Sequence, residues 1–324
     1  MTQEIHLSFR IPEHLNGRRL DQALAELVPD YSRSRLQQWI RDGQVMLDGH
    51  RPRTRDRVHG GETVRIDAVF NEASACLPED IPLDIVYQDS DLLVINKPAG
   101  LVVHPAAGNP DGTLQNALLY YEPALGRLPR AGIVHRLDKE TSGLMVVARS
   151  QLAHKKLVEA LQARAVKREY LAVVNSVLTA GGKVDAPIGR HPVDRKRMAV
   201  VTGGRDAVTH YRVVERYRGH TLVRLQLETG RTHQIRVHMA HIRCPVVGDP
   251  LYGGRLRLPR GANERLQSVL QAFRRQALHA TRLAFTHPGD GHPVNWETPL
   301  PADMTDLVAA LRQDAGLDGN DHGH

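Results

Sequence analysis

The sequence has few cysteines and no long apolar run. Its two cysteines, Cys76 and Cys244, are far apart and share no short-spacing motif, so neither a disulfide framework nor a thiolate zinc site is expected. No uncharged apolar run approaches the roughly 18–20 residues that cross a bilayer. The first ten residues include Glu4, His6 and Arg10 and do not resemble a signal peptide. We therefore expect a cytoplasmic protein with no membrane partner.

Acidic residues are fewer than basic ones. The 324 residues contain 43 Lys and Arg against 36 Asp and Glu, which gives a formal net charge of +7. A basic balance of this size favours an anionic partner, and nucleic acid is the commonest one. Hydrophobic residues make up 41% of the chain, as in an ordinary globular protein. At about 150 residues per domain, the length predicts two domains.

The segment 16–70 has the pattern of a small helix-helix-strand-strand module. Ser32 is a good N-cap for the second helix, and Gly43 is placed to end it in a left-handed conformation. Asp48-Gly49 is a tight-turn signal, and residues 62–66 alternate like a strand. The apolar residues at helical spacing are Leu20, Ala23, Leu24 and Leu27, then Leu36, Trp39 and Ile40.

This module resembles the S4 RNA-binding domain, on the residues 18–21, 32–36, 43–45 and 48–49. The resemblance implies RNA binding. Arg33 and Arg35 on the second helix, followed by four arginines within 51–57, can lie along phosphates. A solvated charged surface is the alternative, because residues 1–70 contain 11 basic residues against 10 acidic ones.

We expect an S4-like domain at 1–75, a linker at 76–85, a second domain at 86–312 and a disordered tail at 313–324. Strands and helices do not alternate regularly in the second domain, which favours an α+β fold over a parallel doubly wound sheet. The clearest strand candidates are 92–95, 143–148, 170–174 and 221–227, and the clearest helix candidates are 152–165 and 263–273.

Three polar segments of the second domain carry the chemistry-bearing residues: 96–105, 132–144 and 227–241. The middle segment is a charged stretch between two apolar runs, which is where catalytic groups often lie. In it, Arg136 and Lys139 flank Asp138 and favour an ionised carboxylate. Such a group is a nucleophile or a general base, or else one half of a surface ion pair. The local sequence leaves these alternatives open.

The three segments, in this order behind an S4-like module, resemble the RluA family of pseudouridine synthases. The resemblance extends from Arg18 to about residue 312. It implies a mixed, largely antiparallel catalytic domain and an enzyme that isomerises uridines in 23S ribosomal RNA, at the stem-loop called helix 69. The implied partner is that RNA or the precursor of the large ribosomal subunit. A monomer is the expected state.

The resemblance also implies roles for individual residues. Asp138 matches the catalytic aspartate, which attacks C1′ of the ribose or removes its 2′ proton. Tyr170 matches the tyrosine that stacks on the uracil. Arg236 matches the basic partner of the carboxylate, and Arg231 is the competing candidate for that pairing. The nearby sequence alone allows Tyr170 to be an ordinary strand aromatic.

Two further residues are implied to bind the substrate. Arg136 holds the flipped nucleotide open, since the chemistry cannot occur inside a base stack. Ile235 forms an apolar wall against the base. Because the product is an isomer of the substrate, no redox cofactor, nucleotide or metal is expected.

Two other functions compete with this one. A metal enzyme is suggested by three histidines close in sequence, His233, His238 and His241, but no carboxylate stands at a recognised ligand spacing. The second alternative is a non-catalytic RNA-binding factor for ribosome assembly that keeps the fold. Asp138 distinguishes the synthase from such a factor, because a non-catalytic protein has no need of this carboxylate.

Overall fold

The chain folds as two compact units, Met1–Cys76 and Leu77–His324. A computed structural model describes residues 2–29, 31, 33–71, 76–106, 108–194 and 196–317. None of the helices in this described part of the chain combines the length and apolar character that a membrane span requires.

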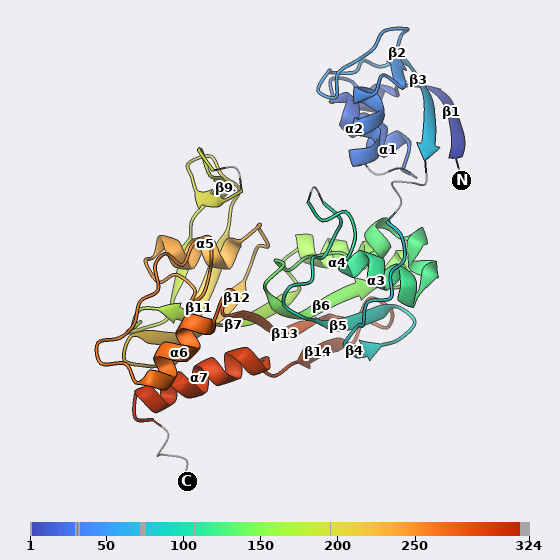
Figure 1. The fold of residues 1–324 in the computed structure, drawn as a ribbon. Coiled ribbons are helices and arrows are strands. Elements are labelled where there is room, and N and C mark those ends of the chain that lie inside the picture. The colour runs from blue at the N-terminus through green and yellow to red at the C-terminus, as the bar shows by residue number, and fades with distance from the viewer. Residues whose placement is uncertain are drawn as a thin grey trace. The chain divides into compact units, whose positions relative to one another are not determined.

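The N-terminal unit is a three-stranded antiparallel sheet with two helices (Figure 1). Its central strand β3 pairs along its whole length with β1, from Thr2 opposite Asn71 to Arg10 opposite Thr63. The helices bury Leu20, Leu24 and Trp39 against this sheet. The elements are β1 (Thr2–Arg10), a 3-10 turn (Glu13–Leu15), α1 (Leu20–Leu27), α2 (Arg33–Arg41), β2 (Val45–Leu47) and β3 (Thr63–Asn71).

The order of elements expected for 16–70 is confirmed, and β1 adds a third strand. Gly43 has φ +73°, and its N–H donates to the Ile40 carbonyl at 3.2 Å, as expected for a left-handed helix end. Asp48 and Gly49 both have positive φ, which is the geometry of the expected tight turn. The proposed N-cap Ser32 lies outside the described residues.

The C-terminal unit is built on a nine-stranded sheet in the order β4-β5-β6-β13-β7-β12-β11-β8, with β14 paired to β13 (Figure 1). The pair β13–β6 is parallel, and the other pairs described in this sheet are antiparallel. The expected α+β class with a largely antiparallel sheet is therefore confirmed. The strands are β4 (Ile85–Gln88), β5 (Leu92–Lys97), β6 (Ser142–Ala148), β7 (Lys167–Asn175), β8 (Gly182–Asp185), β11 (Val208–Arg216), β12 (His220–Leu227), β13 (Leu278–Thr286) and β14 (Pro293–Glu297).

Five α-helices and a small hairpin complete this unit in its described part. Side-chain caps begin three of the helices: Thr113 for α3, Ser150 for α4 and Asn263 for α6. The hairpin of β9 (Ile188–Arg190) and β10 (Met198–Val200) packs on α5 through Ile188 and Val237. The helices are α3 (Leu114–Tyr121), α4 (Gln151–Gln162), α5 (Gln234–His241), α6 (Glu264–Ala272) and α7 (Ala302–Asp314), with 3-10 turns at Pro123–Arg127 and Pro129–Gly132.

Both ends of the C-terminal unit differ from the expected boundaries. The expected linker 76–85 is bonded to the start of α3, since Leu77 accepts from the Asn116 side chain at 2.7 Å and Glu79 accepts from the Gly112 N–H. The expected tail begins inside α7, which continues to Asp314. The buried Asp314 side chain accepts from the Asn263 N–H at 2.7 Å and so docks the helix end beside α6 (Figure 1). Residues 318–324 of that tail lie outside the described residues.

The two halves of the sheet meet where β6 and β13 run parallel. In the register, Ala280 is opposite Gly143. Gly143 has φ +116°, and a Cβ added there would lie 2.3 Å from the Ala280 carbonyl oxygen. Only glycine fits this close approach of two backbones.

We expect Gly143→Ala to lower the free energy of unfolding by about 3 kcal/mol or more, because a positive φ and a backbone clash add together. Urea denaturation of the full chain measures the loss. Gly291→Ala is the matched control, since Gly291 has φ +80° but nothing within 4 Å of the added Cβ. The control should lose about 1 kcal/mol. Equal losses in the two variants would contradict the close-approach explanation.

Candidate active site

Lys97, at the end of β5, ties the first polar segment to the loop that carries Asp138. Its ammonium group is 1% exposed and donates to the carbonyls of Pro98 at 2.7 Å, Leu101 at 2.8 Å and Lys139 at 3.0 Å. The Gly100 N–H donates to the same Lys139 carbonyl at 2.9 Å. The residue after Asp138 is therefore held by two donors from the first segment.

Burial lowers the pKa of Lys97 to about 7, against the opposing charges of Glu140 and Asp138. The geometry favours the charged form, because three carbonyl acceptors match the three protons of an ammonium group and a neutral amine has only two. Lys97 is thus an internal cation whose hydrogen bonds replace water for three loop carbonyls.

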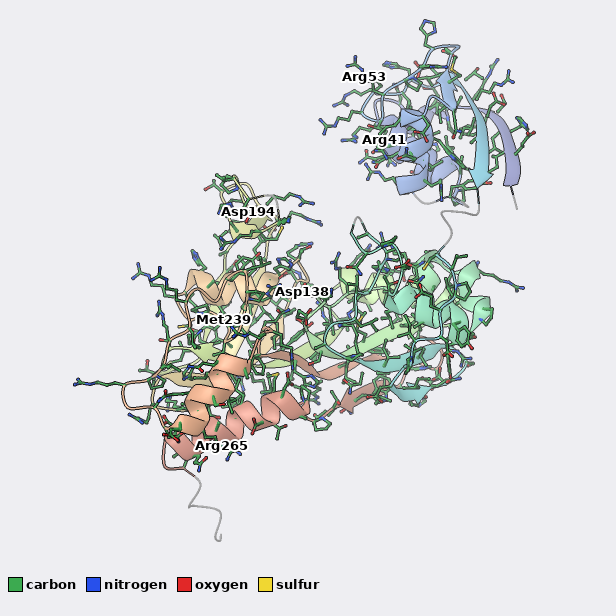
Figure 2. The ribbon with its side chains drawn as sticks, in the orientation of Figure 1. Arg41, Arg53, Asp138, Asp194, Met239 and Arg265 are labelled. Carbon is green, nitrogen blue, oxygen red and sulfur yellow. The ribbon has the colours of Figure 1, made fainter. Side chains whose placement is uncertain are left out.

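Asp138 lies on the wall of a cavity of about 570 Å³. The second polar segment, strand β7 and the third polar segment all contribute to its lining, through Asp138, Tyr170 and Arg236 among others. The Asp138 side chain is 16% exposed. Figure 2 shows Asp138 near the middle of the C-terminal unit, close to the centre of the long sheet.

Arg236 on α5 contacts two carboxylates at once. Its Nη1 donates to Asp138 Oδ2 at 2.9 Å, while Nε and Nη2 donate to the two oxygens of Asp249 at 2.6 and 2.9 Å. Asp249 also accepts from the N–H groups of Leu251 and Tyr252. Burial lowers the pKa of Arg236, but the bonds to Asp249 and the charge of Asp138 raise it further, so the net pKa is above its ordinary value. Arg236 is therefore a fixed cation that orients Asp138.

His233 approaches the other oxygen of Asp138, with Nε2 4.0 Å from Oδ1. Its Nδ1 lies 2.8 Å from the hydroxyl of Tyr252, which already accepts from the Met198 N–H at 2.8 Å. If the Tyr252 hydroxyl donates to Nδ1, the proton of the neutral ring lies on Nε2, toward Asp138. Burial lowers the pKa of His233, against the charge of Asp138, which agrees with a neutral ring. Its φ of +58° is a strained conformation for a histidine.

Tyr170 is on β7, where it pairs with Leu225 of β12 and Ala280 of β13. It is 6% exposed and lines the cavity. Burial raises the pKa of its phenol, Arg168 lowers it and Asp138 raises it, with a net rise. Tyr170 is therefore a neutral phenol at physiological pH, with its ring in the cavity wall.

The other residues expected in the C-terminal site also line the cavity. Arg136 is exposed, and Ile235 is 4% exposed on α5. The Arg231 Nε donates to the Asp206 carbonyl at 3.0 Å, and no ion pair between Arg231 and Asp138 is present among the described residues. Between the two candidates, Arg236 is the one that contacts Asp138.

In the N-terminal unit, Arg33 has an internal partner that sequence analysis did not foresee. It donates to Asp21 at 2.7 Å, together with Arg19 and Gln37. Burial raises the pKa of Asp21, but these donors lower it to about 2 overall. Arg33 thus compensates a fully buried carboxylate. Arg35 is half-exposed on the same helix.

Two of the three histidines that suggested a metal site, His233 and His238, have other partners. His238 lies 2.9 Å from both the Thr209 hydroxyl and the Ala186 carbonyl. Within the described ranges, no group of three or more His, Cys, Asp or Glu side chains is placed to hold a metal ion.

Three side chains that hold the Asp138–Arg236 pair were not foreseen: Lys97, Asp249 and Tyr252. Lys97 lies in the first polar segment, and the only sequence feature that marks it is its position at the end of an apolar strand. Asp249 and Tyr252 follow α5 in an irregular stretch, where neither spacing nor composition marks them.

The chain resembles known proteins in both of its units. Residues 91–241 match the family model of RNA pseudouridylate synthase, and residues 18–64 match that of the S4 domain. The ribosomal large subunit pseudouridine synthase D of Xanthomonas campestris is 58% identical over 94% of this chain and 92% of its own. The proteins of that name from Yersinia pestis and Escherichia coli K12 are 57% and 56% identical, over 97% of both chains. The chain belongs to the RNA pseudouridine synthase family.

Solved structures of pseudouridine synthases have a similar fold. Human RNA pseudouridylate synthase domain containing 4 superimposes with a TM-score of 0.57 at 31% identity, over 71% of this chain and 93% of its own. Human RNA pseudouridylate synthase domain containing 1 gives 0.53 at 28% identity, over 72% and 96%. Together with the relatives, these matches identify an RNA pseudouridine synthase, an isomerase, rather than a non-catalytic assembly factor.

In this synthase we expect Lys97→Met to lower the free energy of unfolding by about 3 kcal/mol, because it leaves the Pro98 and Leu101 carbonyls without a donor and removes one of the two donors to the Lys139 carbonyl. Urea denaturation measures the loss. Lys156→Met is the matched control: Lys156 is exposed and donates to one carbonyl, that of Pro288. The control should lose less than about 1 kcal/mol. A similar small loss for Lys97→Met would contradict the proposed contribution of the buried ammonium group.

Proposed function

We propose that the enzyme converts uridines of 23S ribosomal RNA to pseudouridine at the helix 69 stem-loop, with Asp138 as its nucleophile. The bacterial relatives that share 56–58% of its residues are named for the large ribosomal subunit, which supports this substrate. The enzyme acts as a monomer in the cytoplasm, on the free RNA or on the subunit precursor.

The contact between Asp138 and Arg236 carries the proposal. One oxygen of Asp138 is bonded to a guanidinium that cannot move, because Asp249 holds it from the other side. The second oxygen faces the cavity and His233. A carboxylate that is oriented by one oxygen and open at the other suits attack on a bound substrate.

The target nucleotide must leave its base stack to reach Asp138. A cavity of about 570 Å³ is in the range of small-molecule sites. We place the flipped uracil against Tyr170, with Ile235 as the apolar wall. The exposed Arg136 at the cavity edge then contacts the RNA around the vacated position.

The chemistry needs no group outside the chain and the RNA. Asp138 attacks C1′, or removes the 2′ proton to give a glycal, and in both routes the N1–C1′ electron pair leaves with the uracil. The base then turns and C5 bonds to C1′, while the Asp138–C1′ bond breaks in the first route or the 2′ proton returns to C2′ in the second. C5 loses its proton and N1 gains one, so the product is an isomer. Neither a redox cofactor, a nucleotide nor a metal takes part in this balance.

The S4-like unit supplies a second RNA contact through its arginines. Because Arg33 compensates Asp21, the exposed arginines that follow α2 are better placed to bind phosphates. Arg53 and Arg55 are exposed, and no partner of either guanidinium group is present among the described residues. Figure 2 shows Arg41 and Arg53 on this unit.

In cells lacking the gene, we expect pseudouridine to disappear from the helix 69 stem-loop of 23S ribosomal RNA. The wild-type enzyme should restore it, and Asp138→Asn should not, because the amide has no anionic oxygen for attack. Sequencing that maps pseudouridine measures the outcome. Asp306→Asn, an exposed carboxylate on α7 outside the cavity, is the control and should restore modification. Restoration by Asp138→Asn would refute the nucleophile, and unchanged helix 69 in the deletion would refute the target.

We expect Arg53→Gln with Arg55→Gln to weaken RNA binding and to reduce the slope of log affinity against log salt by about 1.5, because two phosphate contacts are lost. The turnover rate at saturating RNA should not change. Arg265→Gln with Arg274→Gln removes the same charge from exposed positions of the C-terminal unit and serves as control. If the two pairs affect the slope equally, the S4-like unit is not the phosphate-binding part.

A further inference from the structure

Arg168 on β7 is a buried cation without a described counter-ion. It is 8% exposed, lines the cavity of Asp138, and its Nε has no hydrogen-bond partner. Among the described residues, no ion pair to its guanidinium is present. The two other arginines that are buried in the described part of the chain differ: Arg236 pairs with Asp138 and Asp249, and Arg275 pairs with Asp303.

The unpaired Nε–H is costly, because it loses water and gains no acceptor, and no anion in the described structure compensates the charge of the group. A glycine also leaves space for the Arg168 guanidinium. A Cβ at Gly230, in the third polar segment, would lie 2.8 Å from Arg168 Nη1. Burial without a partner and a glycine that admits the group both indicate that Arg168 is kept for a ligand in the cavity.

The position of Arg168 favours the uracil over the RNA phosphates. The cavity has exposed arginines, among them Arg130, Arg136 and Arg164, which suit phosphates that stay near solvent. Arg168 is instead buried, and it shares the inward face of β7 with Tyr170, two residues on. Tyr170 is the residue expected to face the base.

We propose that Arg168 donates a hydrogen bond to a carbonyl oxygen of the target uracil and stabilises the base as it is released. This inference rests on the proposed function, in which the base enters the cavity beside Asp138. When the N1–C1′ bond breaks, its electron pair stays on the ring and the negative charge spreads from N1 to O2 and O4. A positioned guanidinium is most effective where such charge develops. The charge disappears when C5 bonds to C1′, C5 loses its proton and N1 gains one.

The symmetry of uracil allows one fixed donor to serve both halves of the reaction. A half-turn about the axis through N3 and C6 exchanges N1 with C5, and it also exchanges O2 with O4. A donor beside one carbonyl position therefore meets a carbonyl oxygen before and after the base turns. The rigid fork of arginine suits this task, because its five N–H donors tolerate small shifts of the ring.

The first test compares Arg168→Gln with wild type on a stem-loop RNA that contains the target uridine. We expect the single-turnover rate to fall about 100-fold or more, as for loss of a donor to a developing oxyanion. The dissociation constant and its salt dependence should change by less than about threefold, and the melting temperature should stay equal or rise, because an uncompensated buried charge is removed. Lys167→Gln, at an exposed position of the same strand, is the control and should keep the wild-type rate.

The second test substitutes 2-thiouridine or 4-thiouridine at the target, since sulfur is a poor hydrogen-bond acceptor. We expect at least one thio-RNA to slow the wild-type enzyme and to have no further effect on Arg168→Gln, which is the signature of a direct contact in a double-mutant cycle.

Three results would overturn the inference. Weaker binding with a smaller salt slope and an unchanged rate would assign Arg168 to a phosphate. A lower melting temperature with independent thio effects would assign it to the fold. A wild-type rate in Arg168→Gln would leave it without a role, while the proposed function would stand. Absence of pseudouridine with the wild-type enzyme on this RNA would instead refute the proposed function.

Discussion

The site depends on one guanidinium shared between two carboxylates. Asp249 takes two of the Arg236 donors and is itself fixed by two backbone N–H groups, so Arg236 has one orientation. Only Nη1 reaches Asp138, and it occupies one carboxylate oxygen. If Asp249 were absent, Asp138 would be the natural bidentate partner of Arg236, and both of its oxygens would be occupied. The second carboxylate thus keeps the proposed nucleophile oriented and open at once.

The site brings together three parts of the chain that are far apart in sequence, and the sheet holds them in position. Lys97 at the end of β5 fixes the loop after Asp138, β7 carries Tyr170, and α5 carries Arg236. The strands β5–β6 and β7–β12 belong to opposite halves of the sheet and are joined through β13. Gly143 admits Ala280 at that junction, and the Ser142 hydroxyl lies 2.9 Å from His279 Nδ1 on the same pair of strands. The relative position of the residues that line the cavity therefore depends on the parallel contact between β6 and β13.

Sequence patterns predicted the parts of the fold that have simple periodicity. The two helices of the S4-like unit follow from apolar spacing, and a helix was also expected at 263–273. Strand β13 was missed because it is a central strand with polar residues such as His279 and Thr281 buried on it, so neither alternation nor a continuous apolar run marks it. The pairing of Arg236 with Asp249 could not be predicted for another reason. The two residues are thirteen positions apart, and the chain that returns Asp249 to Arg236 is irregular.

Two opposite charges, those of Asp138 and Arg168, line the same cavity without pairing with each other. Asp138 has an oxygen open to the cavity, and Arg168 has no described counter-ion in the same cavity. Opposite charges in one cavity would pair if the backbone allowed it. Here Arg236 holds Asp138 from one side, and Arg168 lies on β7 with its Nη1 close to Gly230. Within the described structure no salt bridge joins Asp138 and Arg168. In the proposed reaction, a substrate that places an electrophilic carbon near Asp138 and a developing anion near Arg168 gives each charge a counterpart.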